Sequence, residues 1–247
     1  MQYRWSHYLA VILVQVLFVT SSVVHADTPP SPSDYLVLLP REPIDLRLSG
    51  TSTLHRWECK ATEVQAALLT NISRKELAQK VNTYLKGHAP EAVSGEEMHV
   101  WLEVMPSKLE CGNTRMHRDL NRAVKSDKYP EIRYWFTAIE GAPRIVTDGG
   151  LTSLAVDVKG KLFLAGITRE VIHTATIELV EGNLIEASGE LALDMRDFDI
   201  EPPTALLGLI RAHAELKVSY RLLLPLDEGA KLDPSTQNLV KRLWDKP

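Results

Sequence analysis

The chain has 247 residues, of which 45% are hydrophobic and 24% are charged, and its formal net charge is −4 at pH 7. This apolar content is enough to bury a core and excludes an intrinsically disordered chain. The small negative charge disfavours a nucleic-acid partner, because nucleic-acid-binding domains normally present a strongly basic face. We therefore expect one folded domain, of a size that single all-β domains commonly reach.

The N-terminus has the features of a secretory signal peptide. Arg4 precedes an apolar run over residues 9–19, and small residues lie near a cut site at Ala26. The alternative is a membrane anchor, but a helix that spans a bilayer needs about 20 apolar residues, and this run is little more than half as long. We expect residues 1–26 to be removed, residues 27–43 to form a linker, and the protein to be periplasmic or secreted.

Apolar and polar residues alternate along much of the remaining chain, which is typical of strands with one buried face. The alternation predicts seven strands, at residues 44–50, 98–104, 132–138, 156–164, 171–179, 185–193 and 216–224. Short connections, including a turn at residues 181–183, indicate a meandering antiparallel sheet. Such a sheet must pack on another sheet or close on itself to protect its edges, and periodicity does not decide between the two.

Two helices are expected to interrupt the strands. Ser73 and Glu76 form a capping box that begins a helix over residues 73–87. A second helix, with apolar residues along one face, is expected from about residue 113 to residue 126. The tail, residues 227–247, predicts a short terminal helix.

Two cysteines, Cys59 and Cys111, lie in the expected mature chain. Because an exported protein meets an oxidising compartment, we expect them to form a disulfide. Two buried free thiols are the alternative. The absence of a Cys-x-x-Cys motif disfavours a redox role.

Four segments, taken in this order, resemble the YceI-like family: residues 50–57 (GTSTLHRW), 128–132 (KYPEI), 160–169 (GKLFLAGITR) and 195–208 (MRDFDIEPPTALLG). The resemblance covers residues 44–226. It implies a mainly β fold, an antiparallel lipocalin-like β-barrel of about eight strands with one or two accessory α-helices. The helix at residues 73–87 is longer than the family leads us to expect and stands as an insertion.

The resemblance also implies a function: an exported protein that holds a polyisoprenoid, a quinone or a fatty acid or amide inside the barrel, for storage or transport across the periplasm. The alternative is a structural or protein-interaction module whose barrel is filled by side chains. Alternation and the resemblance together give these ligand-binding residues: Trp57, Leu102, Val104, Phe136, Val158, Leu162, Leu164, Ile177, Leu191, Val218 and Tyr220.

Small residues share the same inward face, and they either leave room for an elongated tunnel or only relieve crowding at bends. These are Gly50, Ala138, Gly160, Ala175, Ala187 and Gly189. The segment at residues 197–208, which contains two prolines, is the natural candidate for the rim of the cavity.

No catalytic signature supports an enzyme. The sequence HRDL at residues 117–120 resembles a kinase catalytic loop, but Val124 stands where the magnesium-binding asparagine belongs, and no Gly-rich phosphate loop exists. Gly-x-Ser-x-Gly and His-Glu-x-x-His motifs are also missing. We expect no cofactor and no metal, because the histidines of the mature chain are scattered: His55, His88, His99, His117, His173 and His213.

The helix that begins at residue 114 is rich in arginine, with Arg115, Arg118 and Arg122 close together. A basic amphipathic helix can approach anionic lipid headgroups, although a solvated face is the commoner outcome.

The expected partner of the protein is an apolar lipid ligand and not a nucleic acid. A transient contact with a membrane surface and a homodimer both stay open.

Overall fold

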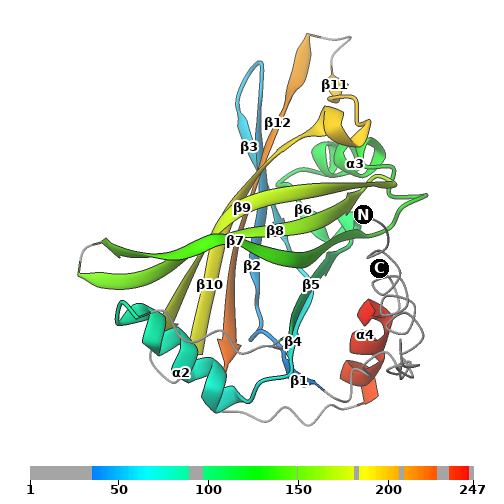
Figure 1. Cartoon of the computed structure of the whole chain (residues 1–247). Coiled ribbons are helices and arrows are strands. Elements are labelled where there is room, and N and C mark those ends of the chain that lie inside the picture. Colours follow the sequence, from blue (N-terminus) through cyan, green and yellow to red (C-terminus); the bar gives the residue numbers. More distant parts are fainter. Residues whose placement is uncertain are drawn as a thin grey trace, which may run out of the picture. The chain divides into compact units, whose positions relative to one another are not determined.

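The computed structural model describes residues 35–88, 97–148, 150–180, 184–205, 209–226 and 234–244. Most of these residues lie in one curled antiparallel sheet, and helices pack beside it (Figure 1). All of them belong to one compact unit, residues 35–247. None of the helices within these ranges has the length and apolar character that crossing a membrane requires.

Within the described ranges twelve strands form the sheet, and every pairing there is antiparallel. In spatial order they are β1-β4-β5-β7-β8-β9-β10-β12-β2-β3-β6, and β11 pairs with β12 outside this path. Their bounds are β1 Leu36–Leu38, β2 Asp45–Ser52, β3 Arg56–Ala61, β4 Gln65–Thr70, β5 Met98–Val104, β6 Leu109–Glu110, β7 Ile132–Asp148, β8 Leu151–Leu164, β9 Ile167–Val180, β10 Leu184–Asp194, β11 Thr204–Ala205 and β12 Ile210–Pro225.

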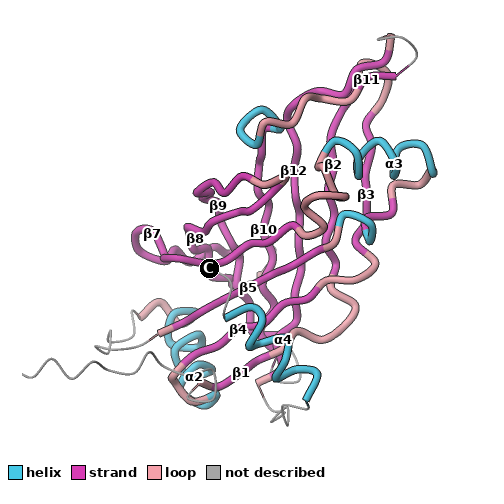
Figure 2. Tube along the Cα trace, turned by 90° about the vertical axis from the view of Figure 1, so that its right-hand side faces the viewer, coloured by secondary structure: helices cyan, strands magenta, loops and turns pink. Residues whose placement is uncertain are grey.

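The sheet curls into a half-barrel, which Figure 2 shows from the side. Among the described residues, the end strands β1 and β6 do not pair with each other. The mainly β, antiparallel fold is confirmed, and each of the seven predicted strands corresponds to a strand of the sheet. The sheet has more strands than the expected eight or so, and it stays open where a closed barrel was expected.

Two of the additional strands, β4 and β1, could not be predicted from alternation, for physical reasons. Five of the six residues of β4 are buried, so both of its faces are covered and no alternation marks it. β1 has three residues, too few to show a period, and it lies in the segment expected to be a linker. The turn predicted at residues 181–183 lies outside the described residues.

Both predicted internal helices are confirmed. They are α2 Arg74–Leu85 and α3 Thr114–Ala123. In α2 the Ser73 hydroxyl accepts a hydrogen bond from the backbone N–H of Glu76, whose carboxylate accepts in turn from the backbone N–H of Ser73. Val81 of α2 is buried in a cluster that includes Leu68 of β4, so this helix covers the sheet near β4.

The predicted terminal helix is also present, as α4 Pro234–Trp244. Val240 is buried in a cluster with Tyr35, Val37 and Leu69. Tyr35 directly precedes β1, Val37 belongs to β1 and Leu69 belongs to β4. Arg242 of α4 forms an ion pair of 3.0 Å with Glu103 of β5, whose side chain is 6% exposed. The tail therefore covers the outer face of β4 and its neighbours, which explains why β4 is apolar on both faces.

A disulfide joins Cys59 of β3 to Cys111, as predicted. Both residues are buried. Cys111 lies three residues before α3, so the bond ties this helix to β3 at the end of the sheet.

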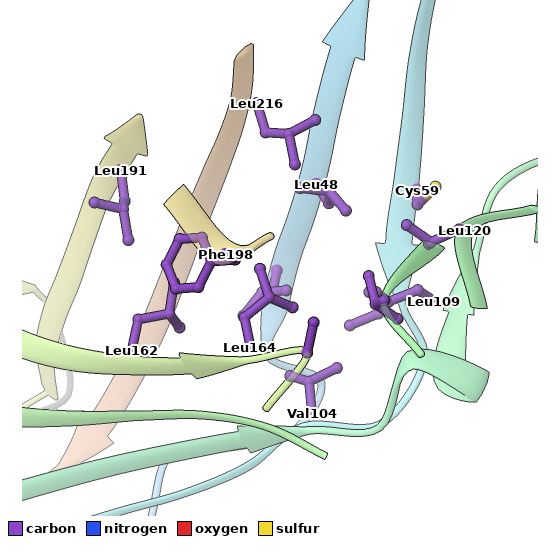
Figure 3. Packing of buried hydrophobic residues seen from close by; sticks show 14 of the residues in the cluster. Leu48, Cys59, Val104, Leu109, Leu120, Leu162, Leu164, Leu191, Phe198 and Leu216 are labelled. Carbon is purple, nitrogen blue, oxygen red and sulfur yellow. The ribbon is translucent and has the colours of Figure 1, made fainter. Parts of the chain in front are cut away.

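The largest cluster of buried side chains includes both cysteines, and Figure 3 shows part of it. It includes Phe198, which is 2% exposed and belongs to the short 3-10 helix η3 Met195–Phe198. The beginning of the segment predicted as a rim, residues 197–208, is therefore packed in the core. Farther along it, Pro203 and Thr204 do line the cavity described below.

Candidate functional site

A cavity of about 1060 Å³ runs inside the half-barrel. Its volume lies just above the usual range for small-molecule pockets, about 300–1,000 Å³. The lining comes mostly from inward-facing apolar side chains of the long strands, because alternation places one face of each strand toward the interior. An interior of this kind is suited to an apolar molecule.

All eleven residues predicted to bind ligand line this cavity. They are Trp57, Leu102, Val104, Phe136, Val158, Leu162, Leu164, Ile177, Leu191, Val218 and Tyr220. The structure thus brings together residues from β3, β5, β7, β8, β9, β10 and β12. That these residues contact a ligand stays a prediction.

Further lining residues were missed because they lie outside the alternating strands. Tyr84 and Val81 of α2 and Met116 and Leu120 of α3 all face the cavity. The helical periodicity of these segments indicates an apolar face, but it does not say which surface that face covers. Leu68 of β4, which also lines the cavity, was not predicted because its strand shows no alternation.

The charged residues of the lining lie away from the long central strands. Lys80 belongs to α2, Glu97 precedes β5, and Arg115 and Asp119 belong to α3. The central strands of the described structure contribute no Lys, Arg, Asp or Glu to the lining. Formal charge is therefore confined to the periphery of the cavity.

Three polar side chains meet in the middle of this apolar surface: Tyr134 of β7, His173 of β9 and Tyr220 of β12. A hydrogen bond of 2.9 Å joins His173 Nε2 to the Tyr220 hydroxyl. The Tyr134 ring meets the His173 ring edge-on, with centroids 6.0 Å apart. We call these three residues the central polar cluster.

Burial keeps the central polar cluster neutral. It raises the pKa of Tyr134 to about 12. It also raises the pKa of Tyr220 well above its ordinary value. The pKa of His173 is lowered by the same cause, so its imidazole is uncharged at neutral pH. The cluster offers hydrogen bonds to a ligand without offering a charge.

Two glycines make room for the tyrosine rings. A Cβ atom on Gly160 of β8 would lie 2.4 Å from the Tyr134 ring, and one on Gly189 of β10 would lie 2.6 Å from the Tyr220 hydroxyl. These positions were expected either to widen a tunnel or to relieve crowding. The space that they leave is instead occupied by aromatic rings.

This packing gives a testable prediction for the variant Gly160→Ala. With Tyr134 present, the extra methyl group is expected to destabilise the fold by about 1–3 kcal/mol through overpacking. In the background Tyr134→Ala the clash is gone, and alanine is favoured over glycine in a strand by roughly 0.5–1 kcal/mol. The sign of the effect should therefore reverse in a double-mutant cycle measured by urea unfolding. The same loss in both backgrounds would contradict the packing.

Throughout the described ranges, His, Cys, Asp and Glu side chains nowhere gather in groups of three or more that could hold an ion. His173, expected to be one of several scattered histidines, instead lies inside the cavity.

Comparison with known proteins decides the family. A family model described as the YceI-like domain matches residues 60–222, about two thirds of the chain. The chain belongs to the YceI-like family. The resemblance read from residues 44–226 is confirmed. A comparison with functionally curated protein sequences finds no significant match to this YceI-like chain.

Solved structures share the YceI-like fold at low sequence identity. The crystal structure of Burkholderia cenocepacia BcnA matches with a TM-score of 0.50 and 12% identity, covering 73% of this chain and 95% of that chain. A polyisoprenoid binding domain from Saccharophagus degradans, implicated in plant cell wall breakdown, matches with a TM-score of 0.50 and 11% identity, covering 77% and 98%. Identities this low show a common fold and nothing about this chain's ligand.

Proposed function

We propose that this YceI-like protein is an exported, non-enzymatic carrier that holds one long apolar lipid inside its half-barrel, for storage or for transport across the periplasm. The observation that carries the proposal is the cavity of about 1060 Å³ with its apolar lining. A polyisoprenoid, a quinone and a fatty acid or amide all have the long apolar chain that such a lining favours.

The energetics of burial favour a ligand with a long chain. Each methylene group removed from water contributes about 0.8 kcal/mol. Association costs about 4–15 kcal/mol, and a micromolar Kd needs a further 8 kcal/mol or so. With an association cost of about 8 kcal/mol, roughly twenty buried methylene groups are required. Short fatty acids fall below this threshold, so the ligand should be long.

Export is supported by two features of the chain. The N-terminal sequence has the pattern of a signal peptide. The buried Cys59–Cys111 disulfide fits an oxidising compartment such as the periplasm.

The alternative of an envelope module with a filled barrel is disfavoured by the cavity volume. An enzyme is disfavoured because acid–base catalysis would need convergent titratable groups, whereas the central strands of the described structure contribute no carboxylate to the lining and His173 is neutral. A transient membrane contact through the arginines of α3 stays part of the proposal. Arg115 and Arg122 both approach Asp119, at 3.7 and 3.6 Å. Because α3 carries three arginines and one aspartate, the helix keeps a net positive charge. A homodimer stays a prediction without a structural argument.

A direct titration tests the carrier function. The mature chain is stripped of lipid and titrated with a tritiated polyprenol of about fifty carbons, and bound label is counted after gel filtration. We expect saturation at one polyprenol per chain with a Kd near the micromolar level or below. A ten-carbon isoprenoid alcohol serves as the control and should bind far more weakly, because it buries too little surface. Uptake that never saturates, or equal affinity for both alcohols, would contradict the carrier function.

A further inference from the structure

We propose that the central polar cluster selects ligands that carry a neutral hydrogen-bond acceptor, a carbonyl oxygen above all, part-way along the buried apolar chain. The inference rests on the proposed carrier function and names the chemistry that the cavity prefers. It makes Tyr134 the residue that determines this preference.

The first step concerns hydrogen atoms that the cluster can donate. Two tautomers of His173 are consistent with its 2.9 Å hydrogen bond to Tyr220. If the Tyr220 hydroxyl donates to Nε2, then Nδ1 carries a hydrogen, and Nδ1 is buried without a hydrogen-bond partner in the described structure. If Nε2 donates instead, the Tyr220 hydroxyl keeps its own hydrogen. Either tautomer leaves one unused donor on this pair.

Tyr134 supplies the second donor. Among the described residues no group forms a hydrogen bond with its hydroxyl, and the ring lines the cavity. When Nε2 donates to the Tyr220 hydroxyl, that hydroxyl and the Tyr134 hydroxyl together offer two donors to the cavity. A carbonyl oxygen has two lone pairs and no hydrogen, so it can accept from both.

The second step concerns position. The inward neighbours of each cluster residue along its strand are apolar: Ile132 and Phe136 beside Tyr134, Val171 and Ala175 beside His173, and Val218 and Leu222 beside Tyr220. A polar atom of the ligand that lies beside these apolar neighbours finds its hydrogen-bond partners at the cluster. Because an unpaired polar group in an apolar interior is unfavourable, the ligand's acceptor should come to rest at the cluster.

The third step excludes ionised groups. A phosphate or carboxylate at this depth would lose its hydration and would meet no cation, since Lys80 and Arg115 belong to the helices at the periphery. Asp157 and its partner Arg144 lie on the opposite, exposed side of β8 and β7. The cluster itself is neutral. A neutral carbonyl is therefore preferred over an anion of the same chain length.

Three probes of equal chain length test the proposal with the lipid-free mature chain at pH 8. They are a saturated C22 hydrocarbon, a C22 ester whose carbonyl lies at mid-chain (undecyl undecanoate) and the free C22 acid, which is ionised at this pH. Affinities are measured by displacement of a fluorescent lipid at concentrations below aggregation. We expect the ester to bind at least tenfold more tightly than the hydrocarbon and at least tenfold more tightly than the acid.

The variant Tyr134→Phe removes one hydroxyl and keeps the ring over Gly160. It is expected to reduce the advantage of the ester over the hydrocarbon to less than threefold, while the affinity for the hydrocarbon stays unchanged. Tyr129→Phe is the matched control, because Tyr129 packs against Phe163 and is not among the described residues that line the cavity. This control should preserve the order and the ratios of the three affinities.

The outcomes separate the two proposals. If the hydrocarbon binds and the ester gains nothing, or if Tyr134→Phe keeps the full advantage of the ester, the selectivity is overturned and the carrier function stands. Tighter binding of the acid than of the ester also overturns the selectivity. If none of the three probes binds while the protein is folded, the carrier function fails and the selectivity fails with it.

Discussion

The variant Ala187→Trp is expected to lose lipid binding by at least 100-fold while remaining folded. Ala187 lies on β10, where it pairs with Ile177 of β9 and Leu222 of β12, and its side chain faces the cavity. A tryptophan side chain buries about 150–250 Å² of surface and would occupy the space that a slender lipid chain needs. A 100-fold loss corresponds to about 2.7 kcal/mol of binding free energy.

The matched control for this variant is Ile172→Trp. Ile172 belongs to β9 but is 60% exposed on the outer face of the sheet. The same tryptophan introduced there should leave the polyprenol affinity unchanged. Both variants are first compared by circular dichroism and thermal unfolding. A folded Ala187→Trp protein that binds polyprenol as tightly as the wild type would show that the lipid does not occupy the interior.

Removal of the disulfide is expected to have the largest effect on stability. Cys59 and Cys111 are 52 residues apart, and a cross-link over a loop of this length stabilises a fold by about 4 kcal/mol in the chain-entropy model. For a domain of this size, that loss lowers Tm by roughly 8–16 °C. The double variant Cys59→Ala/Cys111→Ala suits the test, because both positions are buried and alanine introduces no polar atom.

Reduction of the wild-type protein provides the control for the disulfide. Dithiothreitol should lower the Tm of the wild type toward that of the double variant and should leave the Tm of the double variant unchanged. A wild-type Tm that does not respond to a reductant, under conditions where free thiols are detected, would contradict the stabilising role of the bond.

The interior face of the half-barrel could be predicted from the sequence because it depends on a local pattern. Alternation with a period of two fixes which side chains share a face, as in residues 216–224 of β12. The family resemblance then indicates that this face encloses the interior of the barrel. For this reason the eleven predicted residues all line the cavity.

The rest depended on contacts between distant segments. α4 covers the outer face of β4, and no local sequence pattern in either α4 or β4 predicts this contact. The central polar cluster joins residues 134, 173 and 220, which lie on three different strands and meet only when the sheet curls. Gly160 and Gly189 were expected either to leave room for a tunnel or to relieve crowding at bends, and each faces a tyrosine ring from a neighbouring strand.

Native mass spectrometry tests the central claim most directly. The chain is expressed with its own N-terminus, purified gently from the cell envelope and measured before and after solvent extraction. The account predicts a complex of one chain with one apolar molecule, released on denaturation, with a neutral carbonyl in its structure. A homogeneous ligand-free mass that does not change when long isoprenoids or fatty esters are added would contradict the carrier function and favour a partner-binding module.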